Sequence, residues 1–388
     1  MNQSVSSNVR LIDKITMFLI GIINNTPYVI GIASAERVAE SFKNPTYVGI
    51  ILFANTFSGI FSRFLNNFLV AINLSYLISF FINIIIMISG LLFCAFAKVF
   101  WLTCIGVFFI GFSSNLGETI ILCYITSKRK QILLGPWGSG TGMAGIAGAG
   151  YSLICSACNI SIFWSFIGVA PVAVVYGLLF YLIIAKSPEE EIESKNQPDT
   201  PMLNSQSETD YQEEKLNGCD LSILNGYKFL IFNCGAVYFL EYVIQGVFSH
   251  NCLSAEKAKT HRYMFSLLNL MYQIGVFISR SSISFFVFKK VWILTLFQLL
   301  FFILWLFQGL YHFMGMPFLI STMIIVGLFG GCSYVNIFHL IMNSQTLSTK
   351  QKEMVTSWNS FFIALFIVLS TAFTYVAEKT FMIPPKIE

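Results

Sequence analysis

The chain has 388 residues, of which 56% are hydrophobic and only 11% are charged. Soluble domains carry about 25% charged residues, so this composition excludes an ordinary soluble globular protein. The net charge of +4 is small and is spread over short polar segments. It therefore excludes the basic stripe that binding to nucleic acid phosphates requires.

Apolar segments of about 20 residues recur along the chain and are long enough to cross a hydrocarbon core roughly 30 Å thick. They predict an all-α polytopic membrane protein with about eleven transmembrane helices. The expected helices span residues 11–35, 46–69, 75–97, 99–127, 138–160, 162–185, 227–250, 264–286, 291–311, 316–345 and 353–377.

One long polar segment, residues 186–226, interrupts the apolar pattern and is rich in Glu, Asn, Gln, Ser and Pro. Disordered linkers have this composition. The segment divides the chain into an N-terminal half of six helices, residues 1–185, and a C-terminal half of five helices, residues 227–388. Secondary transporters built from two pseudo-symmetric halves have this hydropathy pattern.

The basic residues predict how the helices are oriented in the membrane. Lys and Arg are more frequent at the helix ends on the N-terminal side than on the opposite side, and Arg10, Lys14 and Arg63 are counted among them. Cytoplasmic loops carry such an excess. We therefore expect a cytoplasmic N-terminus and a cytoplasmic linker.

A glycine-rich segment opens the fifth expected helix. Residues 140–145 read G-T-G-M-A-G, which matches the dinucleotide-binding pattern, but no strand precedes them and no acidic residue follows at the required spacing. Small residues four positions apart instead allow helix backbones to approach closely. We expect a close helix contact at Gly138, Gly140, Gly142 and Gly145, which acts either as a gate or through packing alone.

Three ionisable residues, Glu118, Glu241 and Arg280, lie within expected apolar helices. A charge in the membrane is disfavoured unless it faces a partner or a water-filled cavity, so these residues mark a candidate substrate or ion pathway. The Arg280 guanidinium suits a phosphate or carboxylate, and the two glutamates can take a cationic group or a proton. The alternative is static salt bridging of the glutamates to Arg280 or to another cation. Because Arg280 lies near the end of its helix, its side chain can also extend to water.

Polar residues at helical spacing accompany these charges on four expected helices. They indicate a hydrated or substrate-filled interior, with hydrogen bonding between helices as the alternative. The other candidate pathway residues are Asn25, Tyr28, Asn115, Tyr238, Gln273, Asn336 and His339. A lone His on an apolar helix is more often structural. No hydrolase, metalloprotease or P-loop motif occurs, so we expect neither enzymatic activity nor a cofactor nor a metal.

Six motifs in these helices resemble those of the battenin family. They are N-N-T-P-Y-V at 24–29, S-N-L-G-E at 114–118, W-G-S-G-T-G-M-A-G at 137–145, Y-F-L-E-Y at 238–242, Y-Q-I-G-V-F-I-S-R-S-S at 272–282 and G-G-C-S-Y-V-N-I-F-H at 330–339. The resemblance implies a major-facilitator-like transporter in a lysosomal, late endosomal or vacuolar membrane. The substrate class that it implies is the glycerophosphodiesters, with basic amino-acid transport and organelle pH homeostasis as the alternative.

The chain departs from the family directly after Glu241, where E-Y-V-I-Q-G is one residue shorter than the family's E-Y-F-I-N-Q-G. Removing one residue rotates the remainder of a helix by about 100°, so no role is carried over to Gln245. The expected partners are a small polar solute, protons and membrane lipid. A second hypothesis is a non-transporting scaffold in trafficking or acidification, with the linker at 186–226 as the site that binds sorting machinery.

Overall fold

The structure is a computed structural model that describes residues 9–43, 47–72, 74–128, 130–185, 221–261 and 264–382. These residues form helices and no strand. The first half of the chain contains α1 (Leu11–Ala33), α2 (Ala35–Ser41), α3 (Tyr47–Ala71), α4 (Tyr76–Phe96), α5 (Phe100–Ser127), η1 (Gln131–Leu133), α6 (Leu134–Ala157), α7 (Ile162–Ile167) and α8 (Ala170–Ala185).

The second half of the chain begins with a short 3-10 helix and ends with the longest helix. Its elements are η2 (Leu221–Gly226), α10 (Lys228–Val243), the π-helix η3 (Ile244–Phe248), α11 (Ala255–Thr260), α12 (Met264–Ser281), η4 (Ser282–Ser284), α13 (Val291–Tyr311), α14 (Met316–Met342) and α15 (Thr349–Thr380). Residues 186–220 of the predicted linker lie outside the described residues.

Within the described residues, eight helical segments are long and apolar enough to cross a membrane. The helices α3, α6 and α12 are not among them, although they have 25, 24 and 18 residues. Each of the three carries polar or glycine-rich sequence that faces other helices. The chain is a multi-pass membrane protein, and the total of eleven crossings stays a prediction.

Two of the expected helices are interrupted, each for a local reason. The sixth divides into α7 and α8 because Pro171 has no N–H to donate to the carbonyl of Ile167. The seventh continues from α10 into a π-helical turn, in which Gly246 adopts a non-helical conformation with φ −82° and ψ −107°. This turn follows Glu241 closely, at the point where the sequence is one residue shorter than the family motif.

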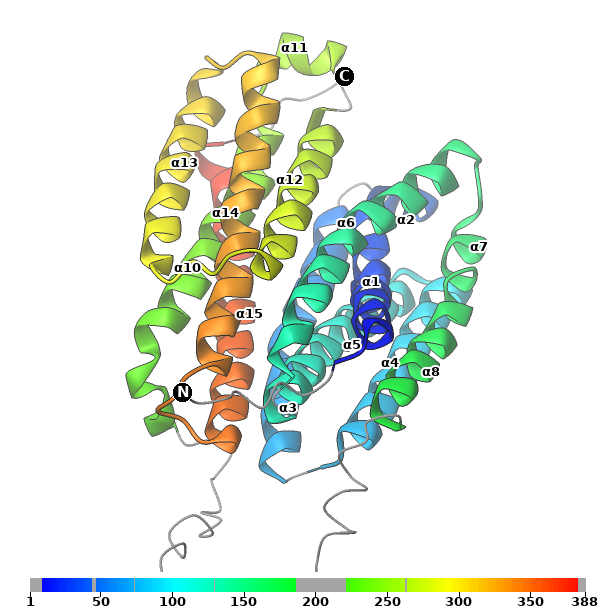
Figure 1. The fold of residues 1–388 in the computed structure, drawn as a ribbon. Helices are drawn as coiled ribbons and strands as arrows, with labels where there is room; N and C mark the ends of the chain where they lie inside the picture. Colours follow the sequence, from blue (N-terminus) through cyan, green and yellow to red (C-terminus); the bar gives the residue numbers. More distant parts are fainter. Residues whose placement is uncertain are drawn as a thin grey trace, which may run out of the picture.

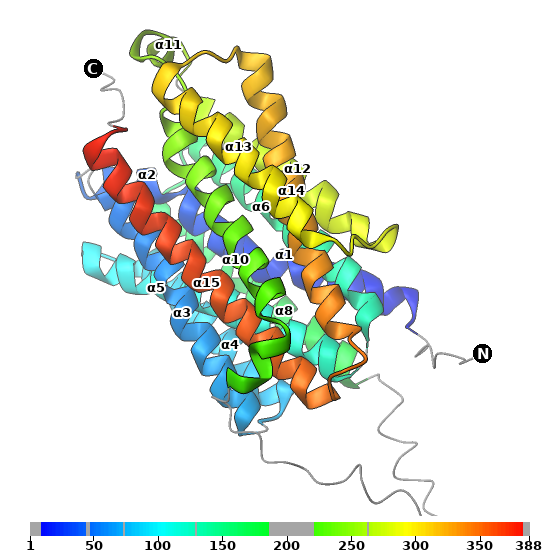
Figure 2. The same cartoon turned by 90° about the vertical axis from the view of Figure 1, so that its left-hand side faces the viewer.

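The helices form two bundles that stand side by side (Figure 1). The N-bundle comprises α1 to α8 and packs mainly through α1 on α6 and through α5 on α3 and α4. The C-bundle comprises η2 to α15 and packs mainly through α12 on α14 and through α10 on α13 and α15. The bundles meet where α6 packs on α12 and where α15 packs on α3 and α5, as the turned view in Figure 2 also shows for α15 and α3.

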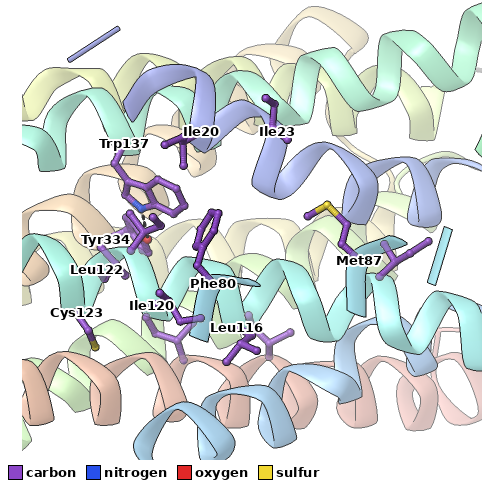
Figure 3. Packing of buried hydrophobic residues seen from close by; sticks show 14 of the residues in the cluster. Ile20, Ile23, Phe80, Met87, Leu116, Ile120, Leu122, Cys123, Trp137 and Tyr334 are labelled. Carbon is purple, nitrogen blue, oxygen red and sulfur yellow. Dashed lines mark hydrogen bonds between the residues drawn. The ribbon is translucent and has the colours of Figure 1, made fainter. Parts of the chain in front are cut away.

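Glycines set the closest approaches between these helices. A Cβ atom added at Gly21 of α1 would lie 2.8 Å from the carbonyl oxygen of Trp137 in α6, and one added at Gly90 of α4 would lie 2.8 Å from the backbone nitrogen of Ile110 in α5. Lipid provides no hydrophobic driving force between helices, so association depends on such close packing. Large buried side chains fill the remaining space, among them Trp137 and Phe80 (Figure 3).

Short polar side chains join the two bundles where α3 and α5 end and α15 begins, which we call the contact end. Asn66 Nδ2 of α3 donates to Ser357 Oγ of α15 at 2.8 Å. The hydroxyls of Thr126 in α5 and Thr356 in α15 lie 3.4 Å apart. The bundles are therefore fastened to each other at this end by hydrogen bonds between small groups.

Candidate functional site

Glu118 of α5 is held by a salt bridge to Arg63 of α3. Arg63 Nη2 lies 2.8 Å from Glu118 Oε2, and the two side chains are 4% and 12% exposed. Arg63 Nη1 also donates to Asn115 Oδ1. Counting Arg63 among the basic residues at the helix ends was therefore wrong, because it lies inside α3 and is buried. The expected helix at 46–69 already contained it, and that was the signal for its interior position.

The second carboxylate oxygen of Glu118 accepts a hydrogen bond from the other bundle. The Tyr334 hydroxyl of α14 donates to Glu118 Oε1 at 2.5 Å. Trp137 Nε1 of α6 donates to the same hydroxyl at 3.5 Å (Figure 3). Tyr334 was not among the predicted site residues, although it lies inside the motif at 330–339. Both oxygens of Glu118 are thus satisfied by Arg63 and Tyr334.

Arg280 of α12 points into the interface between the bundles. Its Nη1 donates to Thr141 Oγ1 of α6 at 2.7 Å, and its Nη2 donates to the Tyr238 hydroxyl of α10 at 3.2 Å. The guanidinium carbon lies 4.3 Å from the centre of the Tyr334 ring, in a cation–π contact. The expectation that this side chain extends to water was wrong.

The salt bridges of the described residues are Arg10 with Asp13 and Arg63 with Glu118. Arg280 therefore has no ionic partner in this part of the chain, and its buried Nε makes no hydrogen bond there. The glutamates do not bridge to Arg280, and the cation that pairs with Glu118 is Arg63.

Glu241 of α10 is the most deeply buried of the four charged residues, at 1% exposure. Its Oε2 has no hydrogen-bond partner among the described residues, whereas the Tyr272 hydroxyl of α12 is within hydrogen-bonding reach of the carboxyl group. A Cβ atom added at Gly330 of α14 would overlap the Glu241 carboxylate. The side chain therefore occupies space that only a glycine in α14 leaves open.

Asn24, which was not predicted as a site residue, organises the polar part of α1. It is fully buried, and its Nδ2 donates to Asn25 Oδ1 and to the carbonyl oxygen of Ser114 in α5, each at 2.8 Å. The Tyr176 hydroxyl of α8 donates to Asn24 Oδ1 at 2.5 Å. Tyr28 contributes its carbonyl oxygen, which accepts from Asn55 Nδ2 of α3 at 3.1 Å. This network lies within the N-bundle and connects α1 to α3, α5 and α8.

The glycine-rich segment of α6 faces two different neighbours. Gly138, Gly142 and Gly145 face the C-bundle, where added Cβ atoms would meet Val335, Phe277 and Gln273 in turn, at 2.9 Å from Val335 Cγ1 and 2.8 Å from Phe277 Cα. Gly140 faces the backbone of Phe18 in α1. The segment thus packs α6 against α1 on one side and against α12 and α14 on the other.

Asn336 and His339 of α14 make local hydrogen bonds outside the charged network. Asn336 Oδ1 accepts from the backbone nitrogen of Phe288 at 2.6 Å, and its Nδ2 donates to the carbonyl oxygen of Cys332 at 2.8 Å. The ring of His339 lies 3.3 Å from Asn343 Nδ2. These contacts fasten the segment before α13 and the end of α14.

A cavity of about 240 Å³ adjoins the contact end. Its lining includes Asn66, Tyr76, Ser127 and Glu353, and the Tyr76 hydroxyl of α4 donates to the Glu353 carboxylate of α15. This cavity could not be predicted from the sequence, because Tyr76 and Glu353 lie at helix ends, where polar residues are ordinary. The cavity lies near the interface between the bundles, but none of the residues predicted as a pathway lines it.

Two helical bundles that pack on each other through α6, α12 and α15 define a membrane protein with a major-facilitator-like fold. The structure is similar to the crystal structure of the human organic anion transporter MFSD10 (TETRAN), with a TM-score of 0.59 over 94% of this chain and 92% of that chain. The two sequences are 9% identical, so this likeness concerns the fold. The predicted fold class is confirmed.

Residues 15–382 match the CLN3 protein family, and the chain belongs to this family. The chain is 27% identical to battenin of Dictyostelium discoideum over 400 residues, which cover 95% of this chain and 94% of that protein. It is 29% identical to the protein btn1 of Schizosaccharomyces pombe over 262 residues, or 65% of each chain. Battenin of Canis lupus familiaris is 28% identical over 247 residues, which cover 61% of this chain and 56% of that protein. The resemblance seen in the sequence motifs is confirmed.

Proposed function

We propose that this protein exports small polar solutes of the glycerophosphodiester type across a lysosomal or vacuolar membrane. The observation that carries the proposal is Arg280, a cation directed into the bundle interface without an ionic partner among the described residues. A guanidinium presents parallel N–H groups that match the oxygens of a phosphate. Family membership supports a membrane transporter, and the chemistry of Arg280 supports the phosphodiester class.

The other charged residues take different roles in this proposal. The Arg63–Glu118 pair is internally neutral, so it shapes the polar wall of the pathway rather than competing for the solute. The Tyr238 hydroxyl already contacts Arg280 and is available to the solute's phosphate as a second donor. Arg280 thus binds the anionic group, and the hydroxyls around it orient that group.

The contact end indicates which side of the membrane is closed in this conformation. Hydrogen bonds between α15 and the helices α3 and α5 hold the bundles together there. With the proposed cytoplasmic N-terminus, this end faces the cytoplasm, because α1, α4 and α15 all begin on that side. The structure then corresponds to the state that is closed toward the cytoplasm, in which an exporter would load solute from the lumen.

Uptake of radiolabelled glycerophosphocholine into proteoliposomes tests the proposal. We expect flux above protein-free vesicles, and we expect Arg280→Gln to abolish it while the exposed Arg10→Gln leaves it unchanged. Arginine uptake without glycerophosphocholine uptake would instead support basic amino-acid transport. If neither solute moves above protein-free vesicles, the transport proposal is wrong and the scaffold hypothesis gains support.

A further inference from the structure

Glu241 and Glu118 are both buried near the interface, but only Glu118 has partners for both oxygens. Glu118 accepts from Arg63 at 2.8 Å and from Tyr334 at 2.5 Å. Glu241 is 1% exposed, and its Oε2 receives no hydrogen bond from the described residues. Ionising a buried carboxyl group is strongly disfavoured when one of its oxygens has no donor, because nothing replaces the lost hydration of that oxygen. The surroundings of Glu241 therefore suit the neutral carboxylic acid.

Among the ionisable groups that face Glu241, one is a cation that could act as its counter-charge. Tyr272 and Arg280 face it from α12, and Arg280 is the charge that acts on it through space. On α10 itself, Cys234, Tyr238 and Tyr242 interact with Glu241. Three ionisable groups on other helices interact with these neighbours: Tyr28 on α1, Glu118 on α5 and Tyr334 on α14. The helices α13 and α15 also pack on α10, and their ionisable residues lie near the helix ends. Because tyrosine and cysteine are neutral when buried, Arg280 is the available counter-charge.

The shape of the site is specific for this carboxyl group. Gly330 leaves the space that the group occupies, since an added Cβ atom would overlap it. Gly327 and Gly331, on either side of Gly330, face the Tyr272 carbonyl and the Ser279 hydroxyl of α12. The glycines of α14 thus allow both the close packing on α12 and the position of the Glu241 carboxyl group.

Glu241 and Arg280 are linked through Tyr238. Arg280 Nη2 donates a hydrogen bond to the Tyr238 hydroxyl oxygen at 3.2 Å. Glu241 follows three residues later on α10, so both side chains lie on the same helix face, one turn apart. The other guanidinium nitrogen reaches Thr141 of the N-bundle at 2.7 Å. A negative charge at Glu241 therefore acts directly on a contact that joins the two bundles.

We propose that Glu241 is a proton-coupling site, which is protonated in this conformation and deprotonated later in the transport cycle. When the carboxyl O–H bond breaks, the proton passes to water in the pathway and the electron pair stays on the carboxylate. Arg280 keeps its own protons and moves from Thr141 toward the new carboxylate, which loosens the contact between α6 and α12. The proposal rests on the proposed function, and it makes solute movement dependent on a proton gradient.

Infrared difference spectroscopy tests the proton site without any solute. The protein in nanodiscs at neutral pH should show the carbonyl stretch of a protonated carboxyl group, and this band should disappear in Glu241→Gln. The matched control is Glu256→Gln, which makes the same change at an exposed residue of α11 and should leave the band in place. If the wild-type and Glu241→Gln spectra show the same carboxyl band, the proposal is wrong. Equal elution from a size-exclusion column confirms that the variants are folded.

Transport assays test the coupling itself. An inward proton gradient should accelerate wild-type uptake of glycerophosphocholine, and Glu241→Gln should lose this acceleration but still exchange internal for external solute at a measurable rate. Glu241→Asp, which restores an acid, should restore part of the gradient dependence. Wild-type uptake that is independent of the gradient would overturn the proton role and leave the proposed function intact. Absence of wild-type exchange would overturn the proposed function, and the infrared result would then decide the proton site alone.

Discussion

Arg63 on α3 and Glu118 on α5 form a salt bridge of 2.8 Å in the interior of the N-bundle. The Tyr334 hydroxyl of the C-bundle donates a hydrogen bond to the other carboxylate oxygen of Glu118. Of the three charges predicted as pathway residues, Arg280 and Glu241 have no ionic partner among the described residues. In the described part of the chain, the contacts of Glu118 are thus complete, whereas Arg280 and Glu241 keep unsatisfied polar atoms.

Removing one member of the pair should destabilise the protein. In Arg63→Gln, Glu118 is left as a buried charge without its cation, which costs about 3–5 kcal/mol. Thermal unfolding of the detergent-solubilised protein measures this loss. The double variant Arg63→Gln with Glu118→Gln should recover much of the stability, and purely additive effects of the two changes would contradict a direct pairing.

Tyr334→Phe should separate the two contacts of this side chain. The variant keeps the ring beneath Arg280 but loses the hydrogen bond to Glu118, so we expect a loss of about 1.5–3 kcal/mol in unfolding free energy. Tyr334→Leu also removes the cation–π contact and should lose about 1 kcal/mol more. The exposed Tyr311→Phe is the matched control and should unfold like the wild type. Equal stability of Tyr334→Phe and the wild type would show that this hydrogen bond contributes nothing.

The glycines of α6 allow a matched test of close packing. A Cβ atom at Gly142 would lie 2.8 Å from Phe277 Cα, whereas one at Gly150 would meet nothing within 4 Å. We expect Gly142→Ala to reduce the unfolding free energy by about 1–3 kcal/mol, because the α6 and α12 backbones must separate. Gly150→Ala on the same helix should be neutral or slightly stabilising. Thermal unfolding compares the two, and a Gly142→Ala variant as stable as Gly150→Ala would refute the tight contact.

Cross-linking the contact end should arrest transport. Cysteines introduced at Asn66 and Ser357, whose side chains are hydrogen-bonded at 2.8 Å, can be joined by a short reversible thiol-reactive reagent. We expect the cross-linked protein to lose solute flux and to regain it after reduction. Each single cysteine variant, treated in the same way, controls for reaction at the native cysteines. Undiminished flux in the cross-linked protein would mean that this end does not open during transport.

The fold followed from the sequence because apolar segments of membrane length leave few alternatives to a helical bundle. Hydropathy and the family motifs were enough to predict a helical membrane protein with a major-facilitator-like architecture. Of the eleven predicted spans, eight are long and apolar enough to cross a membrane in the described part of the chain. The interruptions within individual helices were harder to predict from the sequence. Pro171 explains the division of α7 from α8 after the fact, but a proline near a helix start is also common in unbroken helices.

The candidate site was only partly predictable, because a sequence shows which charges lie in a helix but not what they face. Arg63 was counted with the basic residues at the helix ends although it lies inside the expected helix at 46–69, so the partner of Glu118 was missed. Arg280 lies near a helix end, where extending to water and turning inward look the same in sequence. Its direction depends on Thr141 and Tyr238, which come from two other helices. Tyr334 could not be recognised as a site residue from the sequence, because its role depends on Glu118 and Arg280, which lie on two other helices.

The short polar side chains at the contact end bear on how easily the two bundles can come apart. Water can replace each hydrogen bond there as the side chains separate, so that breaking the contacts of Asn66 with Ser357 and Thr126 with Thr356 leaves no polar group unsatisfied. A contact made of interlocked leucines or phenylalanines would instead expose apolar surface to water when the bundles separate. The two arrangements of such a molecule can then be nearly equal in free energy, and the arrival of a single solute molecule would be enough to decide between them.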